Sequence, residues 1–314
     1  MFTTYLFIIS GLVLLAVGAE GLVRGSSSIA LRLGVTPLVI GLTVVAFGTG
    51  SPELFVSVQA AYNGNSGIAL GNVIGSNISN IALILGLSAL ARPMPVRSEL
   101  IRREVPLMIC ITLMLCLLLW DGTLSRIDGL ILIIGSIAYT AFTYLTAKRD
   151  KNTVVASEFE EAISQPKRAA VFDAAFVLLG FAALLIGANL LVSGATVIAE
   201  QFGISQVVIG LTVIAIGTSL PELATSLVAS LRNEADVAFG NVLGSNILNI
   251  LCILGIAALI NPFQVEGLRF LDFGVFIGSA ILVLPLLWRG AVLNRWEGAL
   301  LVVGYFAYLY SLTI

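Results

Sequence analysis

The sequence predicts an all-α integral membrane protein with ten transmembrane helices arranged as two inverted five-helix repeats. Three observations predict this fold. Hydrophobic residues make up 58% of the 314 residues and charged residues only 11%, which is more apolar surface than one soluble core can bury. A long stretch of sequence occurs twice, and the basic residues are distributed unevenly between the loops.

The duplicated stretch covers residues 41–90 and 210–259, which agree at 27 of 50 positions with a constant offset of 169. The segment from Gly18 matches the segment from Gly187 at the same offset. The N-terminal apolar run therefore belongs to the repeat, and it also lacks the basic start of a signal peptide, so we expect it to remain in the mature protein.

Apolar runs of about 20 residues each correspond to one spanning helix. We expect helices at 4–23, 35–61, 68–91, 105–120 and 127–147, and again at 172–192, 204–231, 237–260, 270–288 and 296–313. The first repeat then occupies residues 1–147 and the second residues 171–314, joined by the polar, charged segment 148–170. Because each half has an odd number of spans, the two halves cross the membrane in opposite directions, as in many secondary transporters.

The basic residues predict the orientation. If the N-terminus is extracellular, fourteen of the sixteen Lys and Arg residues fall in inner loops, and only Arg126 and Arg269 lie outside. This bias follows the positive-inside rule. The sequence therefore predicts a multi-pass protein of the cell membrane with both termini extracellular and the 148–170 segment in the cytoplasm.

Composition removes several classes of function. A net charge of −2 without a basic patch argues against nucleic-acid binding. The absence of histidine removes imidazole metal sites, histidine triads and histidine proton relays. The three cysteines lie inside apolar runs without metal-type spacing, so we interpret them as packing residues. We expect no cofactor and no enzymatic activity.

Two carboxylates stand near the middle of predicted spans. Glu53 and Glu222 each follow a proline in a glycine-rich run, GTGSPE or GTSLPE. A buried ionised carboxylate costs at least a few kcal/mol unless something compensates it. Pro52 and Pro221 cannot donate a backbone hydrogen bond, so the helix opens there and exposes carbonyl oxygens. Such breaks are tolerated at membrane depth where they line a cavity.

The third and eighth spans carry a second paired motif, GNVIGSNISN and GNVLGSNILN. Its amide and hydroxyl residues recur every four positions and so share one helical face. Together with two carboxylates and free carbonyls they make an all-oxygen cage, which suits calcium, with about six to eight oxygens at about 2.3 to 2.6 Å, and also suits sodium. The residues on these faces are Asn72, Ser76 and Asn80 in the first copy and Asn241, Ser245 and Asn249 in the second.

Two other interpretations fit part of this pattern. Glycine, serine and asparagine could simply pack helices, with each glutamate protonated or paired to a distant arginine; this does not explain two buried glutamates in matching helix breaks whose spans contain no basic residue. An intramembrane hydrolase would need a water-activating carboxylate pair, whereas each carboxylate here sits in a symmetric set of potential ligands.

The paired motifs resemble the alpha-repeats of the cation/calcium exchanger superfamily, especially the prokaryotic sodium/calcium exchangers, over nearly the whole chain. The resemblance implies alternating access, with Ca²⁺ and Na⁺ as transported substrates competing for a central site between spans 2, 3, 7 and 8. We expect a protein that functions as a monomer in the lipid bilayer. By position, the resemblance implies calcium ligands at Glu53, Glu222, Thr49 and Thr218, the threonines through backbone oxygen, and sodium ligands at Ala46, Ala215, Ser76, Ser245, Ser219 and both glutamates, with Asn80 and Asn249 at the centre.

Two positions depart from the family pattern. Gly50 stands where the family usually has serine, with Ser51 displaced by one, which removes a hydroxyl from one expected sodium site unless another group fills the gap. Asn249 stands where a potassium-dependent branch has aspartate, which predicts potassium independence.

The resulting functional prediction is exchange of several sodium ions for one calcium ion. Two ionised glutamates balance one Ca²⁺ or two Na⁺, so a third sodium would make transport electrogenic. A calcium/proton antiporter on the same scaffold, in which the glutamates bind protons instead of sodium, remains an alternative at this point. From their length and glycine content, we expect the first and sixth spans to slide past the other helices.

Overall fold

The computed structural model describes residues 2–33, 35–64, 66–150, 169–201, 215–265, 268–288 and 290–312. Over these residues the chain is helical apart from turns and four two-residue strands. Six helices are long and apolar enough to cross a membrane, and a bent pair, Pro37–Thr49 with Ser51–Tyr62, makes a seventh. The predicted all-α membrane class is confirmed, whereas the number of ten spans stays a prediction.

The first half begins with the long helix α1. The next span is divided into short pieces, and the span after that is interrupted in its middle by a π-helical turn. The elements are α1 (Phe2–Leu33), α2 (Pro37–Ile40), η1 (Gly41–Val45), α3 (Ala46–Thr49), α4 (Ser51–Tyr62), α5 (Ser66–Ser79), η2 (Asn80–Leu85), α6 (Gly86–Ala91), β1 (Met94–Pro95), η3 (Leu100–Glu104), α7 (Val105–Leu118), β2 (Thr123–Leu124) and α8 (Arg126–Asp150).

The described part of the second half repeats this order. Its elements are α10 (Ala170–Gln201), α12 (Ala215–Thr218), α13 (Leu220–Leu231), α14 (Ala235–Leu248), η5 (Asn249–Leu254), α15 (Gly255–Ile260), β3 (Phe263–Gln264), α16 (Phe270–Trp288), β4 (Val292–Leu293) and α17 (Arg295–Leu312). The expected helix at 204–231 falls partly on residues 202–214, which lie outside the described residues.

The sequence offset of 169 reappears in the structure. The helices α3, α4, α5 and α6 and the turn η2 correspond residue for residue to α12, α13, α14, α15 and η5. Two small antiparallel pairings join the halves crosswise: β1 pairs with β4, with Met94 opposite Leu293, and β2 pairs with β3, with Thr123 opposite Gln264. Each half therefore contributes one strand to each pairing.

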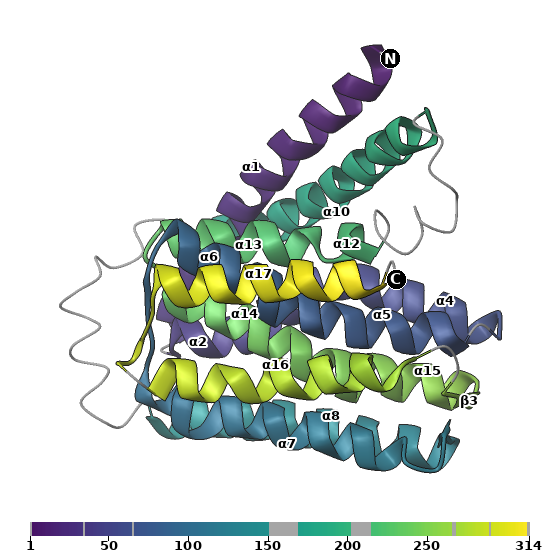
Figure 1. Cartoon of the computed structure of the whole chain (residues 1–314). Helices are drawn as coiled ribbons and strands as arrows, with labels where there is room; N and C mark the ends of the chain where they lie inside the picture. The colour runs from purple at the N-terminus through teal and green to yellow at the C-terminus, as the bar shows by residue number, and fades with distance from the viewer. Residues whose placement is uncertain are drawn as a thin grey trace.

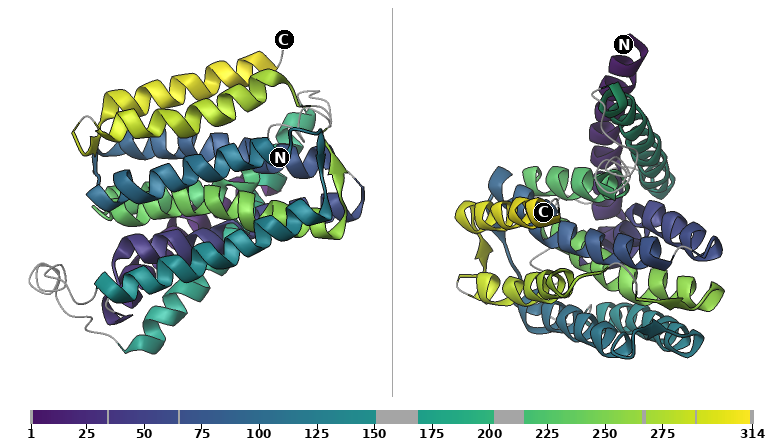
Figure 2. Two further views of the ribbon diagram at one scale, coloured as in Figure 1. Left: turned by 90° about the horizontal axis from the view of Figure 1, so that it is seen from below. Right: turned by 45° about the vertical axis from the view of Figure 1, so that its right-hand side comes forward.

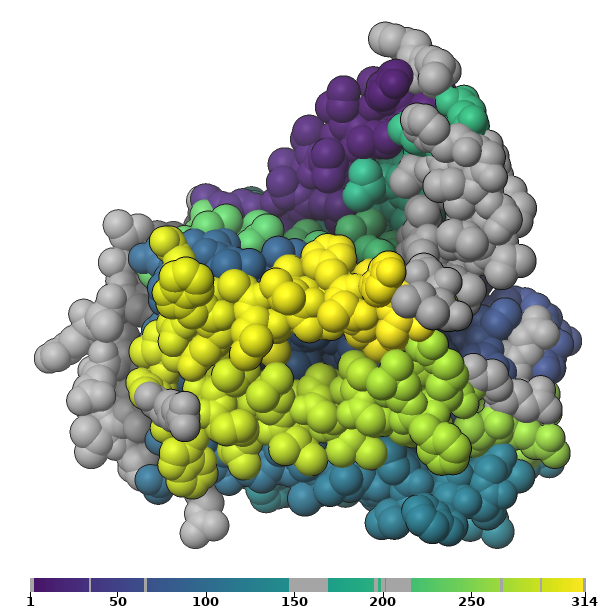
Figure 3. Space-filling view, viewed as in Figure 1, coloured from purple at the N-terminus to yellow at the C-terminus, as the bar shows by residue number. Residues whose placement is uncertain are grey.

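The motif-bearing helices lie at the centre of the bundle. The spanning windows in Gly67–Ala91 and Ala235–Ile260 are 83% and 78% buried, against 28% for both Arg126–Thr146 and Phe270–Trp288. Figure 2 shows α5 and α14 surrounded by the other helices, and in the space-filling view α16 and α17 form most of the near face in front of them (Figure 3). Peripheral helices therefore separate the polar motifs from lipid.

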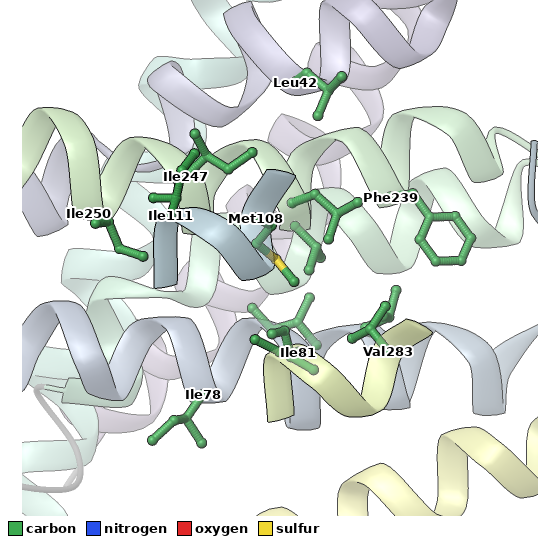
Figure 4. Close-up of a cluster of buried hydrophobic side chains, with 14 of the residues drawn as sticks. Leu42, Ile78, Ile81, Met108, Ile111, Phe239, Ile247, Ile250 and Val283 are labelled. Carbon is green, nitrogen blue, oxygen red and sulfur yellow. The ribbon is translucent and has the colours of Figure 1, made fainter. Parts of the chain in front are cut away.

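An apolar cluster supports the central helices from the side of α7. Met108 of α7 is fully buried among residues of η2, α14 and α16, including Ile81, Ile247 and Val283 (Figure 4). The Asn246 side-chain amide of α14 contacts the Met108 sulfur at 3.7 Å. Close packing of this kind resists displacement, so the cluster fixes the polar helices in register.

The helices α1 and α10 project together from the bundle (Figures 1 and 2). They touch backbone to backbone through paired glycines: a Cβ at Gly18 would lie 2.7 Å from the Gly180 carbonyl oxygen, and a Cβ at Gly187 would lie 2.9 Å from that of Gly11. Such close approach is possible only without side chains at these positions.

Both helices extend beyond the expected ranges 4–23 and 172–192, since each has 32 residues. The extra turns of α1 carry charges that find partners. Arg24 pairs with Glu20, and Arg32 pairs with Asp173 of α10 at 2.6 Å. Paired charges allow the helix to continue past the end of the apolar run, which hydropathy alone does not predict.

Candidate functional site

The two helix breaks expected from the prolines are present. Helix α3 ends at Thr49 and α4 begins at Ser51, with a bend of 48° between them. Gly50 and its repeat counterpart Ser219 have non-helical dihedral angles, φ −74° and ψ 3° for Gly50 and φ −88° and ψ 7° for Ser219. Pro52 and Pro221 take the second position of the new helix, where a missing N–H is tolerated.

The two glutamates lie in the first turns of α4 and α13, and each is only 1% exposed. The first turn of a helix favours a negative charge because the backbone N–H groups point toward it. None of the ion pairs in the described part of the chain includes either glutamate. Both buried carboxylates therefore lie without a basic partner among those residues.

Ser219 connects the breaks to the third span. Its hydroxyl donates to Glu53 Oε1 at 2.9 Å and lies 3.4 Å from the Ser76 hydroxyl. This brings together three predicted site residues from α4, α5 and the break before α13. The other carboxylate oxygens, Glu53 Oε2 and Glu222 Oε2, are buried without a hydrogen-bond partner in the described structure.

Four asparagines lock α5 and η2 to α14 and η5. The Asn77 amide donates to the Asn246 carbonyl oxygen at 3.1 Å, and the Asn246 amide donates back to the Asn77 carbonyl oxygen at 3.3 Å. The Asn80 amide donates to Asn246 Oδ1 at 3.0 Å, and the Asn249 amide donates to Asn77 Oδ1 at 2.9 Å. The side-chain nitrogens of Asn80 and Asn249 are thereby engaged. The side-chain oxygen of Asn80 is buried without a partner among the described residues.

A second pair of asparagines holds the broken spans against the third and eighth helices. The Asn72 amide donates to the Glu53 carbonyl oxygen at 3.2 Å and to the Ser57 hydroxyl at 2.9 Å. The Asn241 amide makes the same two contacts, at the same distances, with Glu222 and Ser226. Ser57 and Ser226 were not among the predicted site residues, although they are identical in both copies of the repeat.

The threonines before the breaks also reach across the site. The Thr49 hydroxyl donates to Asn241 Oδ1 at 3.0 Å, and Thr218 is buried. The Thr49 hydroxyl is thus engaged, and the backbone oxygens of the breaks remain the candidate ligands. Ala46 is buried, and its carbonyl accepts from the Gly50 N–H at 3.0 Å. Ala215 begins α12, but its side chain lies outside the described residues.

Gly50 makes the two sides of the site unequal. The displaced Ser51 does not replace the missing hydroxyl, because its side chain donates to the Phe47 carbonyl oxygen of the preceding helix α3 at 3.2 Å. Ser245, the repeat counterpart of Ser76, has no hydrogen-bond partner for its hydroxyl in the described structure. A small cavity adjoins Gly50, lined by Ala46, Phe47, Gly50, Leu54, Leu248, Asn249, Cys252 and Ile253.

The potential cation ligands at the centre of the site are oxygen atoms. In the described part of the chain, no group of three or more His, Cys, Asp or Glu side chains comes together. A cation here would rely on two carboxylates and on neutral oxygens of hydroxyls, amides and carbonyls. Hard cations such as Ca²⁺ accept this ligand set, and the uncompensated negative charge favours a cation over an anion.

The sequence matches the sodium/calcium exchanger protein family over residues 3–145 and 172–314, on both sides of the connecting segment. The chain belongs to this family. The expected resemblance is therefore confirmed, and the family is one of transporter-type membrane proteins.

Named relatives match nearly the whole length of the chain. It is 40% identical to the putative antiporter CaxA of Alkalimonas amylolytica, over 99% of both chains. It is 33% identical to the sodium/calcium exchanger MaX1 of Methanosarcina acetivorans, over 97% of both chains. A structure of the sodium-calcium exchanger NCX_Mj superposes with a TM-score of 0.86 at 35% identity, covering 99% of each chain.

One feature of the site has no signal in the sequence. The helices α5 and α14 continue into the π-helical turns η2 and η5, which start at Asn80 and Asn249. π-Helical turns often occur at functional sites because they move a side chain out of the regular helical row. Here they coincide with the two central asparagines.

Proposed function

We propose that the protein is a sodium/calcium antiporter that exchanges several Na⁺ ions for one Ca²⁺ ion by alternating access. The observation that carries the proposal is the pair of buried, unpaired carboxylates, Glu53 and Glu222, at matching helix breaks. Their charge balances one Ca²⁺ or two Na⁺, so the two ions would compete for the same ligands.

The proposed site lies between spans 2, 3, 7 and 8. Family membership and the described contacts among these segments support the assignment. Calcium would bind the two carboxylates and the backbone oxygens of Thr49 and Thr218. Sodium would use both carboxylates and oxygens of Ala46, Ala215, Ser76, Ser245 and Ser219, with Asn80 and Asn249 at the centre.

The proposed topology has ten spans in two inverted halves, residues 1–147 and 171–314, with both termini extracellular in the cell membrane and a monomer as the working unit. The crosswise strand pairings and the offset of 169 support two related halves. Arg92 and Arg295 cap one end of the bundle through the carbonyls of Leu231 and Ala91, which agrees with a cytoplasmic surface there.

Calcium flux into proteoliposomes tests the function. Vesicles loaded with sodium and diluted into radioactive calcium should accumulate calcium at fixed pH, and vesicles loaded with choline should not. A proton ionophore should leave this uptake intact. Uptake that follows a pH gradient and ignores sodium would contradict the proposal.

That result would instead favour calcium/proton antiport on the same scaffold. Glu53 Oε2 and Glu222 Oε2, buried without partners among the described residues, are atoms on which a proton could be carried. Sodium dependence at fixed pH therefore separates the two functions with one assay.

A further inference from the structure

The two sides of the proposed ion site are built from residues related by the offset of 169, so any inequality between them must come from residues that differ. Ser219 on one side corresponds to Gly50 on the other. The Ser219 hydroxyl bridges Glu53 Oε1, at 2.9 Å, and the Ser76 hydroxyl, at 3.4 Å. On this side, hydrogen bonds therefore join the oxygens of Glu53, Ser219 and Ser76.

The opposite side lacks the bridging atom. A Cβ at Gly50 would lie 3.8 Å from Glu222 Oε1 and 3.8 Å from Asn249 Oδ1, so a serine hydroxyl there would come within reach of Glu222, the counterpart of Glu53, and of the Asn249 side chain. Without it, the Ser245 hydroxyl has no partner in the described structure, whereas its counterpart Ser76 has one. The side chain of Ser51 is committed to the Phe47 carbonyl.

The space left by the absent side chain is not closed by a neighbour. A small cavity adjoins Ala46, Gly50 and Asn249 and continues toward Cys252. A buried water needs two to four polar partners. The Ala46 carbonyl oxygen, Asn249 Oδ1 and Glu222 Oε1, which would lie 3.1, 3.8 and 3.8 Å from a Cβ at Gly50, can supply them at this position.

We propose that a water molecule at Gly50 takes the place of the missing hydroxyl and completes the cation position beside Glu222. The inference rests on the proposed sodium/calcium exchange and adds to it that the two sodium positions flanking the glutamates are unequal. The position beside Glu53 has only protein ligands, and the position beside Glu222 is partly hydrated and binds sodium more weakly. Gly50 is then the residue that sets the sodium concentration needed for exchange.

Four variants separate a ligand effect from a packing effect, with sodium-dependent calcium uptake as the readout. Gly50→Ser should lower the sodium concentration for half-maximal uptake by about threefold to tenfold, as expected for one added hydrogen-bonding ligand. Gly50→Ala displaces the water without replacing it and should raise that concentration. Serine should be tolerated sterically, because a Cβ at Gly50 would come within 3.1 Å only of the Ala46 carbonyl oxygen, and Ser219 occupies the equivalent position.

The other two variants use the repeat as an internal control. Ser219→Gly should raise the half-maximal sodium concentration, since it removes the hydroxyl beside Glu53. The transposed double variant, Gly50→Ser with Ser219→Gly, should return toward the wild-type value because one complete and one hydrated side are restored.

Three outcomes would overturn the inference. These are equal effects of Ala and Ser at position 50, an unchanged half-maximal sodium concentration in both, or a double variant as impaired as Ser219→Gly alone. If wild-type uptake shows no sodium dependence, the proposed function itself fails, which is a different result. Direct calorimetric titration of the purified variants with sodium gives the same ranking independently of transport and detects variants that do not fold.

Discussion

At the scale of single residues, the proposed cation binding depends most on Glu53 and Glu222, because they are buried carboxylates without basic partners in the described structure. Their breaks could be predicted from Pro52 and Pro221, and their surroundings from the paired GNxxGSN motifs. The hydrogen-bond partners of the asparagine side chains could not be predicted. The packing of α5 against α14 shows that the Asn80 amide donates to Asn246 Oδ1 and the Asn249 amide donates to Asn77 Oδ1.

Replacement of either glutamate by glutamine tests this account at residue scale. Removal of one partner of a buried charge cluster costs about 3 to 5 kcal/mol, which corresponds to a loss of calcium transport of more than about 100-fold. Glu53→Gln and Glu222→Gln should both lose sodium-driven calcium uptake while inserting normally. The exposed Glu99→Gln is the matched control. Uptake close to wild type in either site variant would disprove the assignment.

At the scale of elements, the sequence predicts where spans begin and break but not how they are distorted. The π-helical turns at Asn80 and Asn249 have no proline or glycine signature of their own, and the helix interior around them reads as an ordinary apolar run. The helix α1 continues beyond the expected range because Arg32 pairs with Asp173, a partner 141 residues away that hydropathy does not reveal.

A charged contact joins α1 to the bundle, and the corresponding positions of the repeat carry no charge. Glu20 of α1 forms ion pairs with Arg24 and with Arg232, directly after α13, and α1 packs along α13. The repeat counterparts of Glu20 and Arg232 are the neutral residues Asn189 and Asn63. If α1 and α10 are the sliding elements, this contact stabilises the state in which α1 rests on α13.

Glu20→Gln should therefore shift the conformational equilibrium. A partly exposed ion pair contributes about 0.5 to 1 kcal/mol, which changes the population ratio by about twofold to fivefold. Spin labels at Val17 and Leu231, both exposed, in a background with the three cysteines replaced by alanine, would report the distance between α1 and α13. A larger long-distance population is expected in Glu20→Gln and not in the control Asn189→Gln. Identical distance distributions would show that the contact does not select a state.

At the scale of the whole molecule, the apolar composition predicted the membrane class, and the duplicated sequence predicted the relation between halves that the strand pairings reflect. The crosswise pairing itself was not predictable, since strands of two residues leave no alternating pattern. The joint projection of α1 and α10 likewise depends on glycine contacts between helices, such as Gly18 with Gly180, rather than on either helix alone (Figure 1).

Transport should carry net charge and ignore potassium. Two glutamates cannot neutralise three sodium ions, and Asn80 and Asn249 add dipoles without charge. Moving one elementary charge is worth about 2.3 kcal/mol per 100 mV, enough to change flux several-fold. In sodium-loaded proteoliposomes, a potential positive inside, set without potassium, should speed calcium entry. Rates that ignore the potential would indicate two sodium ions per calcium, and a requirement for added potassium would contradict the meaning given to Asn249.

Competition between the two ions at one site is the central claim, and equilibrium binding of radioactive calcium to the purified protein at fixed pH tests it most directly. Sodium should displace calcium completely, with a Hill coefficient above one because more than one sodium replaces each calcium, and choline at equal ionic strength should not. Glu222→Gln should bind no calcium at the same concentrations. Calcium that stays bound at saturating sodium, or that leaves only on acidification, would contradict the account.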